Sequence, residues 1–105
     1  LRVVKEMLER TPHQHLHVVY GTVADKDISA ALKELPREAI FYFCKADIPR
    51  ALDADALQLQ AQNAGLRGSV FPTVRAALVA AQQAAGTGDL VLVTGSVFVV
   101  AEALE

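Results

Sequence analysis

The regular alternation of short apolar runs with segments of helical periodicity constrains this sequence most. Apolar or β-branched runs lie at residues 15–23, 39–44, 68–71 and 89–93. Apolar residues at helical spacing follow each run, over residues 28–35, 57–64, 74–81 and 97–104. Strands that alternate with helices form parallel sheets through right-handed crossovers, with helices on both faces. We therefore predict an α/β domain of three layers, Rossmann-like, with a mainly parallel sheet.

Residues suited to helix ends mark the predicted boundaries. Candidate N-caps are Asp25 or Asp27 for the first of these helices, Asp53 for the second and Thr73 for the third. Gly65 is placed for a left-handed turn at a helix end. The valines of residues 97–104 also allow a strand, but Ser96 is a natural cap and residues 101–105 favour a helix. We expect Thr94-Gly95-Ser96 to interrupt the fourth apolar run before this helix begins.

Size and charge exclude several classes of protein. The 105 residues fit one domain, and a net charge of -2 with interspersed signs supplies no basic patch for nucleic acid. No apolar run approaches the ~20 residues that span a bilayer, and no leader opens the chain, so we expect neither a membrane protein nor an exported one. Cys44 is the single cysteine, which precludes an internal disulfide and fits the cytoplasm.

The first residues suggest that the domain is truncated. The chain begins with Leu1 rather than Met, and Leu1, Val4 and Leu8 have helical spacing. A crossover helix over residues 1–10 needs a strand before it. We therefore expect a first strand upstream of Leu1, and an exposed sheet edge through which residues 1–105 could self-associate.

Ligands of open parallel sheets bind beyond the carboxyl ends of the strands. This rule selects four loops, at residues 21–27, 45–53, 72–73 and 94–98. In Thr94-Gly95-Ser96, glycine permits close approach, and the Ser96 hydroxyl beside a helix start would suit a carboxylate; alternatively Ser96 only caps its helix. The sequence contains no G-x-S-x-G, P-loop or G-x-G-x-x-G motif, so no complete nucleotide site can be argued from these residues.

Other chemically capable residues have simple structural interpretations beside functional ones. Lys26 between Asp25 and Asp27 could meet an anionic substrate, or the three could form a solvated turn. Arg50 could hold a carboxylate with two hydrogen bonds, or be ordinary surface. His13, His15 and His17 would share one face of a strand, but at its amino end, where we expect a polar strand entrance rather than a metal site. Cys44 is expected to pack in the core.

Three motifs, in order, give the chain a resemblance to a known family. They are VVYGTVADKD at residues 18–27, FCKADIPRAL at residues 43–52 and VLVTGSVFVVAEAL at residues 91–104. Together they resemble the C-terminal domain of folylpolyglutamate synthase, often bifunctional as dihydrofolate synthase, in the Mur ligase superfamily. The resemblance covers nearly the whole chain, and the T-G-S-x-aromatic core is its most distinctive part.

The resemblance implies an ATP-dependent ligase that phosphorylates a folate or dihydropteroate carboxylate, after which the amine of L-glutamate attacks the acyl phosphate. The P-loop and most Mg²⁺ ligands of that family belong to a central ATPase domain. By position, Ser96 and Phe98 match residues associated with glutamate, whereas Asp25, Lys26, Asp27 and Arg50 match residues near the interdomain cleft. The family's Asp-x-Ala-His-Asn-Pro motif is absent, so we expect neither ATP binding nor catalysis by residues 1–105 alone.

Two alternatives remain open at this point. The nearer one is a Mur-type ligase that adds amino acids to peptidoglycan precursors, against which the Asp-Lys-Asp loop favours folate. The other is a non-enzymatic, receiver-like binding module with Asp25 and Asp27 as an acidic cluster. A receiver would also need acidic residues at other strand ends, where Cys44 and Thr94 stand.

Overall fold

The computed structural model describes residues 15–24, 28–95 and 97–104, over which strands and helices alternate. Each strand and helix predicted within these residues is present, whereas the helix predicted over residues 1–10 lies outside them. The elements are β1 (Leu16–Gly21), α2 (Ser29–Glu34), β2 (Ile40–Phe43), α3 (Ala54–Asn63), β3 (Arg67–Val70), α4 (Val74–Ala84), β4 (Leu90–Gly95) and α5 (Val97–Ala103).

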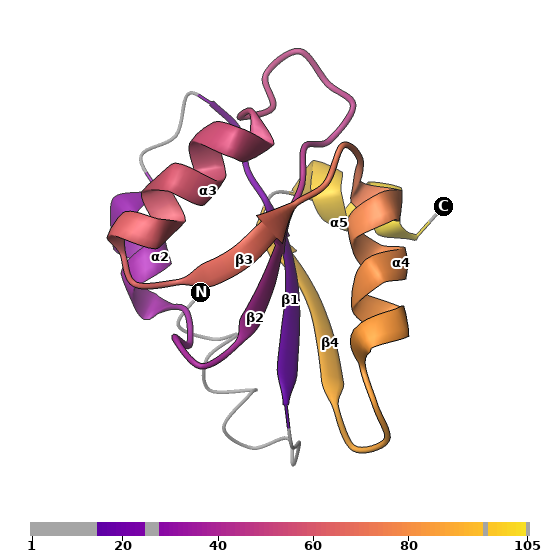
Figure 1. The fold of residues 1–105 in the computed structure, drawn as a ribbon. Helices are drawn as coiled ribbons and strands as arrows, with labels where there is room; N and C mark the ends of the chain where they lie inside the picture. Colours follow the sequence, from indigo (N-terminus) through magenta and orange to yellow (C-terminus); the bar gives the residue numbers. More distant parts are fainter. Residues whose placement is uncertain (1–14, 25–27, 96, 105) are drawn as a thin grey trace.

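The four strands form one sheet in the order β3-β2-β1-β4, and every neighbouring pair is parallel. Helices α2 and α3 cover one face of the sheet and α4 and α5 cover the other (Figure 1). The predicted three-layer, parallel α/β architecture is therefore confirmed. Because the strands run the same way, all four carboxyl ends lie at the upper edge in Figure 1, which we call the carboxyl rim.

The face under α2 and α3 is built around two aromatic side chains of β2. Phe41 and Phe43 are fully buried, and their rings stack with centroids 5.7 Å apart. Leu32 of α2 and Leu57 of α3 belong to the same buried cluster. Removing a side chain of this size from water stabilises the fold by about 1.5–3 kcal/mol, so this cluster holds both helices on the sheet.

The opposite face accommodates α4 and α5 through small and β-branched side chains. Ala77 and Ala81 lie one turn apart on α4 and are fully buried, as is Val99 of α5. Their cluster includes Val19 of β1. Residues 97–103 form helix α5, so the helical interpretation of this segment is confirmed and the strand interpretation is wrong. The inward side is not the predicted one, because Val99 is buried whereas Val100, Ala101 and Leu104 are exposed.

The helix ends agree only partly with the predicted caps. Thr73 caps α4 as predicted, because its Oγ1 accepts a hydrogen bond of 3.0 Å from the amide of Ala76. Asp53 occupies the cap position of α3, but its side chain makes no capping bond; its carbonyl accepts from Leu57 instead. The cap position of α2 is occupied by buried Ile28, and Asp25 and Asp27, the predicted caps, lie outside the described residues.

Two glycines near element ends behave differently from one another. Gly65 has a φ of 87°, which confirms the left-handed turn predicted after α3. The sequence suggested that Gly95 interrupts the fourth strand, and this prediction is wrong. The strand continues through Thr94 and Gly95, because these residues pair with Tyr20 and Gly21 of β1.

His17 lies at the amino end of the sheet and is buried, with 2% of its surface exposed. Its Nδ1 lies 2.8 Å from the Tyr42 hydroxyl oxygen, and its Nε2 lies 3.0 Å from Asp89 Oδ2. The prediction of a plain polar strand entrance is wrong for His17, because these partners replace water around the ring. His15 is exposed, and His13 lies outside the described residues.

The charge of Asp89 indicates which groups of this network donate hydrogen bonds and which accept them. Asp89 Oδ2 also accepts a 2.9 Å hydrogen bond from the Gly86 amide, and this bond, followed by that from His17, lowers the pKa of Asp89. An ionised carboxylate only accepts, so Nε2 of His17 donates. Burial and the nearby Asp89 charge raise the pKa of Tyr42, which keeps its hydroxyl protonated and able to donate to Nδ1.

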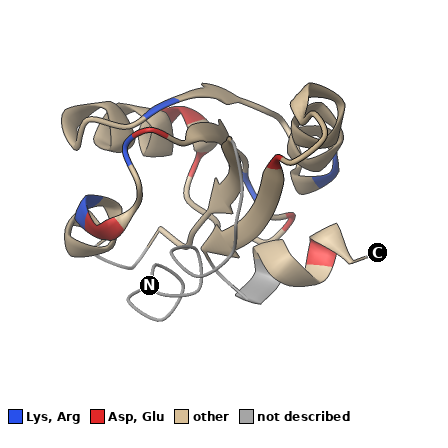
Figure 2. Ribbon diagram, turned by 90° about the horizontal axis from the view of Figure 1, so that it is seen from below, with Lys and Arg blue, Asp and Glu red and all other residues tan. Residues whose placement is uncertain are grey.

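Charged residues are distributed over both helix layers and the connecting turns. Figure 2 shows Lys and Arg interspersed with Asp and Glu rather than gathered by sign in the view from below. Among the described helices, none is long and apolar enough to cross a membrane.

Candidate functional site

The turns that follow the four strands meet at the carboxyl rim. The register aligns Gly21 with Gly95 and Phe43 with Val70, and the amide of Cys44 donates to the carbonyl of Tyr20. Loops that are far apart in sequence are therefore adjacent here. The rim is where ligands of open parallel sheets bind.

Two of these turns are joined by backbone hydrogen bonds. Val23 and Ala51 form an antiparallel bridge, flanked by a 2.7 Å bond from the Ala24 amide to the Arg50 carbonyl and a 2.9 Å bond from the Leu52 amide to the Thr22 carbonyl. The residues that lead into the loop 25–27 are thus held directly against the turn that carries Arg50.

The rim also requires close backbone approach between β1 and β4. A Cβ added to Gly21 would lie 2.7 Å from the Cys44 carbonyl oxygen and 2.8 Å from a methyl carbon of Val99. A Cβ on Gly95 would overlap the carbonyl oxygen of Gly21, and Gly95 has a φ of 117°. Glycine at these two positions brings the β4–α5 turn against β1.

A cleft of about 640 Å³ lies beside these turns. Asp47, after β2, donates its amide to Glu102 Oε2 over 2.7 Å, which joins the turn to α5. The cleft contains a cation, two carboxylates and a hydroxyl, so its polar groups can meet both ends of a small zwitterion. Its lining residues are Lys45, Ala46, Asp47, Ile48, Pro49, Pro72, Thr73 and Glu102.

Cys44, which adjoins this cleft, is a buried thiol rather than a nucleophile. Its Sγ is directed at the Tyr20 carbonyl oxygen, 3.6 Å away. Burial, and secondarily the negative charge of Glu102, raises the pKa of Cys44 to about 12. The thiolate is the reactive form of cysteine, so the predicted packing role of Cys44 is confirmed.

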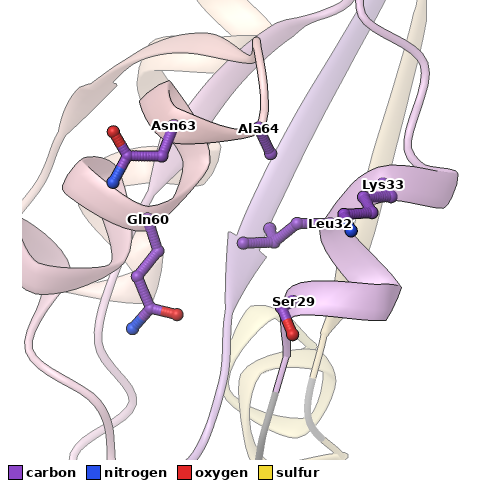
Figure 3. Close-up of a pocket in the computed structure, with 6 residues that line it drawn as sticks. All are labelled: Ser29, Leu32, Lys33, Gln60, Asn63 and Ala64. Carbon is purple, nitrogen blue, oxygen red and sulfur yellow. The ribbon is translucent and has the colours of Figure 1, made fainter.

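A second groove, of about 290 Å³, lies between α2 and α3 (Figure 3). Ser29, Leu32 and Lys33 border it from α2, and Gln60 and Asn63 from α3. Among the residues that the structure describes, those lining this groove belong to α2 and the end of α3 rather than to the strand-end turns. The larger cleft at the carboxyl rim is therefore the better candidate for a functional site.

A family model described as the Mur ligase, glutamate ligase domain matches residues 1–97 of the chain. The chain belongs to this family.

Sequence relatives place this glutamate ligase domain in longer proteins. A probable bifunctional folylpolyglutamate synthase/dihydropteroate synthase of Haloferax volcanii is 40% identical over 103 residues, and a protein of the same description from Halobacterium salinarum is 38% identical over 101. Each alignment covers 95% of this chain and 12% of the relative. The chain thus spans a small part of the relatives it matches.

Solved structures share the fold of this glutamate ligase domain. E. coli FolC in complex with DHPP and ADP superposes with a TM-score of 0.86 at 28% identity, covering 97% of this chain and 24% of FolC. A bifunctional folylpolyglutamate synthase/dihydrofolate synthase of Yersinia pestis, complexed with AMPPNP and Mn, gives 0.78 at 25% identity and covers 98% and 25%. The domain therefore corresponds to about a quarter of each solved chain.

The structure locates the predicted site residues unevenly. Arg50 is exposed on the rim, in the turn bonded to residues 22–24. Ser96 and the loop of Asp25, Lys26 and Asp27 lie outside the described residues. Phe98 is the second residue of α5, but its side chain is not among those described. The three turns are represented in the described part of the chain by Ala24, Arg50 and Gly95. These residues all lie at the same edge of the sheet, as the sequence predicted.

Glu102 is the rim residue that the sequence analysis missed. It lies three residues after Val99, on the inner side of α5, yet it carries a charge. No signal in the sequence pointed to it, because the apolar spacing there favoured an inward side formed by Val100, Ala101 and Leu104, whereas the structure turns Val99 inward. Its partner Asp47 could not be inferred, because 55 residues separate the two.

Proposed function

We propose that the chain is the C-terminal domain of an ATP-dependent folate:L-glutamate ligase, and that the carboxyl rim faces the central ATPase domain of the same polypeptide. The observation that carries this proposal is the convergence of the β1–α2, β2–α3 and β4–α5 turns. Curated relatives and solved neighbours named as folylpolyglutamate synthases support it.

The proposed reaction forms an amide. ATP phosphorylates a folate or dihydropteroate carboxylate, and the amine of L-glutamate then attacks the acyl carbon and displaces phosphate. ATP and Mg²⁺ supply the phosphoryl group and the countercharge when bound. This chain has no P-loop, and its described residues contain no group of three metal-ligating side chains, so we assign their binding to the central domain.

This chain's own contribution is to orient glutamate and exclude water. We assign the glutamate carboxylate to Ser96 and the wall of its pocket to Phe98. Asp25, Lys26, Asp27 and Arg50 are assigned to the interdomain cleft. Closure of the rim over the central domain would bring the amine to the acyl phosphate and protect that intermediate from hydrolysis. The isolated domain, which provides only one side of such a cleft, would then be inactive.

The names of the similar proteins disagree about the second activity. Solved neighbours combine folylpolyglutamate synthase with dihydrofolate synthase, whereas the haloarchaeal relatives combine it with dihydropteroate synthase. Their common activity is glutamate addition to folate, and our proposal rests on that activity. Assays of the intact polypeptide with dihydropteroate and with a folate monoglutamate, each with L-glutamate and ATP, will separate the possibilities.

Ser96→Ala tests the glutamate assignment in the intact polypeptide. We expect the KM for L-glutamate to rise by about tenfold, with a smaller change in the KM for ATP, because a hydroxyl bonded to a carboxylate contributes about 1.5–3 kcal/mol. Ser69→Ala, at an exposed position of β3, is the matched control. Equal changes in both KM values, or none, would contradict the assignment.

Two further properties belong to this proposal. β4 is an outer strand of the described sheet, so we propose that another strand covers it in the intact protein, and that residues 1–105 alone self-associate there. Sedimentation of a strict monomer at high concentration would disprove the self-association. We also propose a cytoplasmic location, with which a single cysteine and no internal disulfide are compatible.

A further inference from the structure

Glu102 extends from α5 toward the end of β2. It follows fully buried Val99 by three residues and is itself half-buried. The negative charge of Glu102 contributes to the raised pKa of Cys44, so the carboxylate lies near Cys44, the residue that follows β2. Partial burial removes part of the hydration of this carboxylate, so a hydrogen-bond partner in the protein can replace some of it.

That partner is a backbone amide of the turn after β2. The Asp47 N–H donates to Glu102 Oε2 over 2.7 Å, a length typical of a charge-assisted hydrogen bond. Within the same turn, the Ile48 amide donates to the Ala46 carbonyl and the Ala51 amide to the Ile48 carbonyl. These two bonds hold residues 46–51 together as one turn, and the bond to Glu102 joins that turn to α5.

The far end of this turn is fixed separately. The Arg50 carbonyl accepts from Ala24, and the Leu52 amide donates to Thr22, so residues 50–52 are tied to the β1–α2 turn. The turn after β2 is thus held from α5 at Asp47 and from β1–α2 at Arg50. Helix α5 itself begins directly after Thr94-Gly95-Ser96.

We propose that Glu102 is a positioning residue of the ligase. Its carboxylate fixes the turn that carries Arg50 relative to the helix that follows Thr94-Gly95-Ser96, so that both sides of the rim approach the substrate as one body. This inference rests on the proposed function. It adds to that function a residue outside the four strand-end loops, whose effect on glutamate binding passes through the Asp47 amide.

Glu102→Ala and Glu102→Gln in the intact polypeptide test this role. Alanine removes the acceptor, and we expect the Asp47 amide to exchange its hydrogen about tenfold faster, with the KM for L-glutamate about tenfold higher and kcat within about twofold. Glutamine keeps an acceptor oxygen and should restore most of both values. Glu34→Ala, at an exposed position of α2, is the matched control and should change neither.

The outcomes separate this inference from the proposed function. If the wild-type polypeptide ligates glutamate but the alanine and glutamine variants behave alike, Glu102 is not a positioning residue. An equal fall in kcat and kcat/KM with a lower melting temperature also overturns the inference, since it indicates a merely structural role. Absence of glutamate ligation in the wild type would overturn the proposed function instead, while the exchange rate of the Asp47 amide would still decide whether Glu102 holds the turn.

Discussion

His17, Tyr42 and Asp89 form a buried polar network in which every donor has an acceptor. The hydroxyl of Tyr42 and the carboxylate of Asp89 occupy the two ring nitrogens of His17, and the Gly86 amide shares the same carboxylate oxygen. Buried polar groups are costly only when they lack partners. The network therefore fixes the α4–β4 turn against β1 while pairing both ring nitrogens of His17.

We predict that Asp89 makes the stability of the domain depend on acid pH. Its pKa in the folded state lies below the ordinary value of 3.8, so its ionised form stabilises the fold at pH values above 3.8. This contribution is lost as the pH falls through the lower pKa of the folded state. Asp89→Asn should therefore lose less stability than the wild type between about pH 6 and about pH 3 in urea unfolding.

Asp53→Asn is the control for this prediction, because Asp53 is exposed and its side chain makes no capping bond. The pH dependence of its stability should be closer to that of the wild type than the pH dependence of Asp89→Asn is. Identical profiles for Asp89→Asn and the wild type would show that the carboxylate is not stabilised by folding.

The sequence could indicate the placement of the histidines but not their surroundings. Alternation put His15 and His17 on one face of a strand, and the structure buries only the second of them. The partners of His17 are 25 and 72 residues away, so no local pattern could reveal them. For the same reason Glu102 escaped notice. Residue types and spacing predicted the rim, but contacts across the rim depend on strand order.

Among the elements, β1 and β4 lie close together where both end in glycine. We predict that Gly95→Ala lowers the free energy of unfolding by about 3 kcal/mol or more, because its Cβ would overlap the Gly21 carbonyl and its φ of 117° suits only glycine. Urea unfolding measures this loss. Gly86→Ala is the matched control, since its Cβ would meet only Asp89 Oδ2 at 3.9 Å, and it should change stability by less than about 1 kcal/mol.

A Gly95→Ala variant that unfolds at the same urea concentration as Gly86→Ala would refute this close packing. A variant that cannot be recovered in folded form, beside a normal Gly86→Ala, would agree with it. The test also bears on function, because Gly95 lies in the T-G-S motif and its backbone brings the start of α5 to β1.

The elements themselves followed from periodicity, and their ends did not. Four short apolar runs became four parallel strands, because each is followed by a segment of helical spacing long enough to form the crossover that parallel strands need. The cap of α4 was predictable, since Thr73 stands directly before the helix. The start of α2 was placed less well, because the residue at its cap position is the apolar, buried Ile28, which no capping rule selects.

At the scale of the whole molecule, the two ends of the sheet carry different properties. The amino end holds the satisfied network of His17, which contributes to stability. The carboxyl rim collects the turns, the glycines of close approach and the cleft. Parallel strands impose this division, because every strand-to-helix turn falls at one edge and every helix-to-strand turn at the other. Variants at the two ends should therefore affect different measurements.

Arg50→Ala and Arg67→Ala in the intact polypeptide test this division. Arg50 is exposed on the rim, and its backbone carbonyl accepts the bond from Ala24, a bond that alanine at position 50 can also make. We expect kcat/KM for glutamate ligation to fall on the order of tenfold. Arg67 is exposed at the amino end of β3, so Arg67→Ala removes the same charge at the opposite edge of the sheet and should leave kcat/KM unchanged. Equal effects of the two variants would mean that net charge, not position on the rim, governs the reaction, and the assignment of Arg50 to the interdomain cleft would then be wrong.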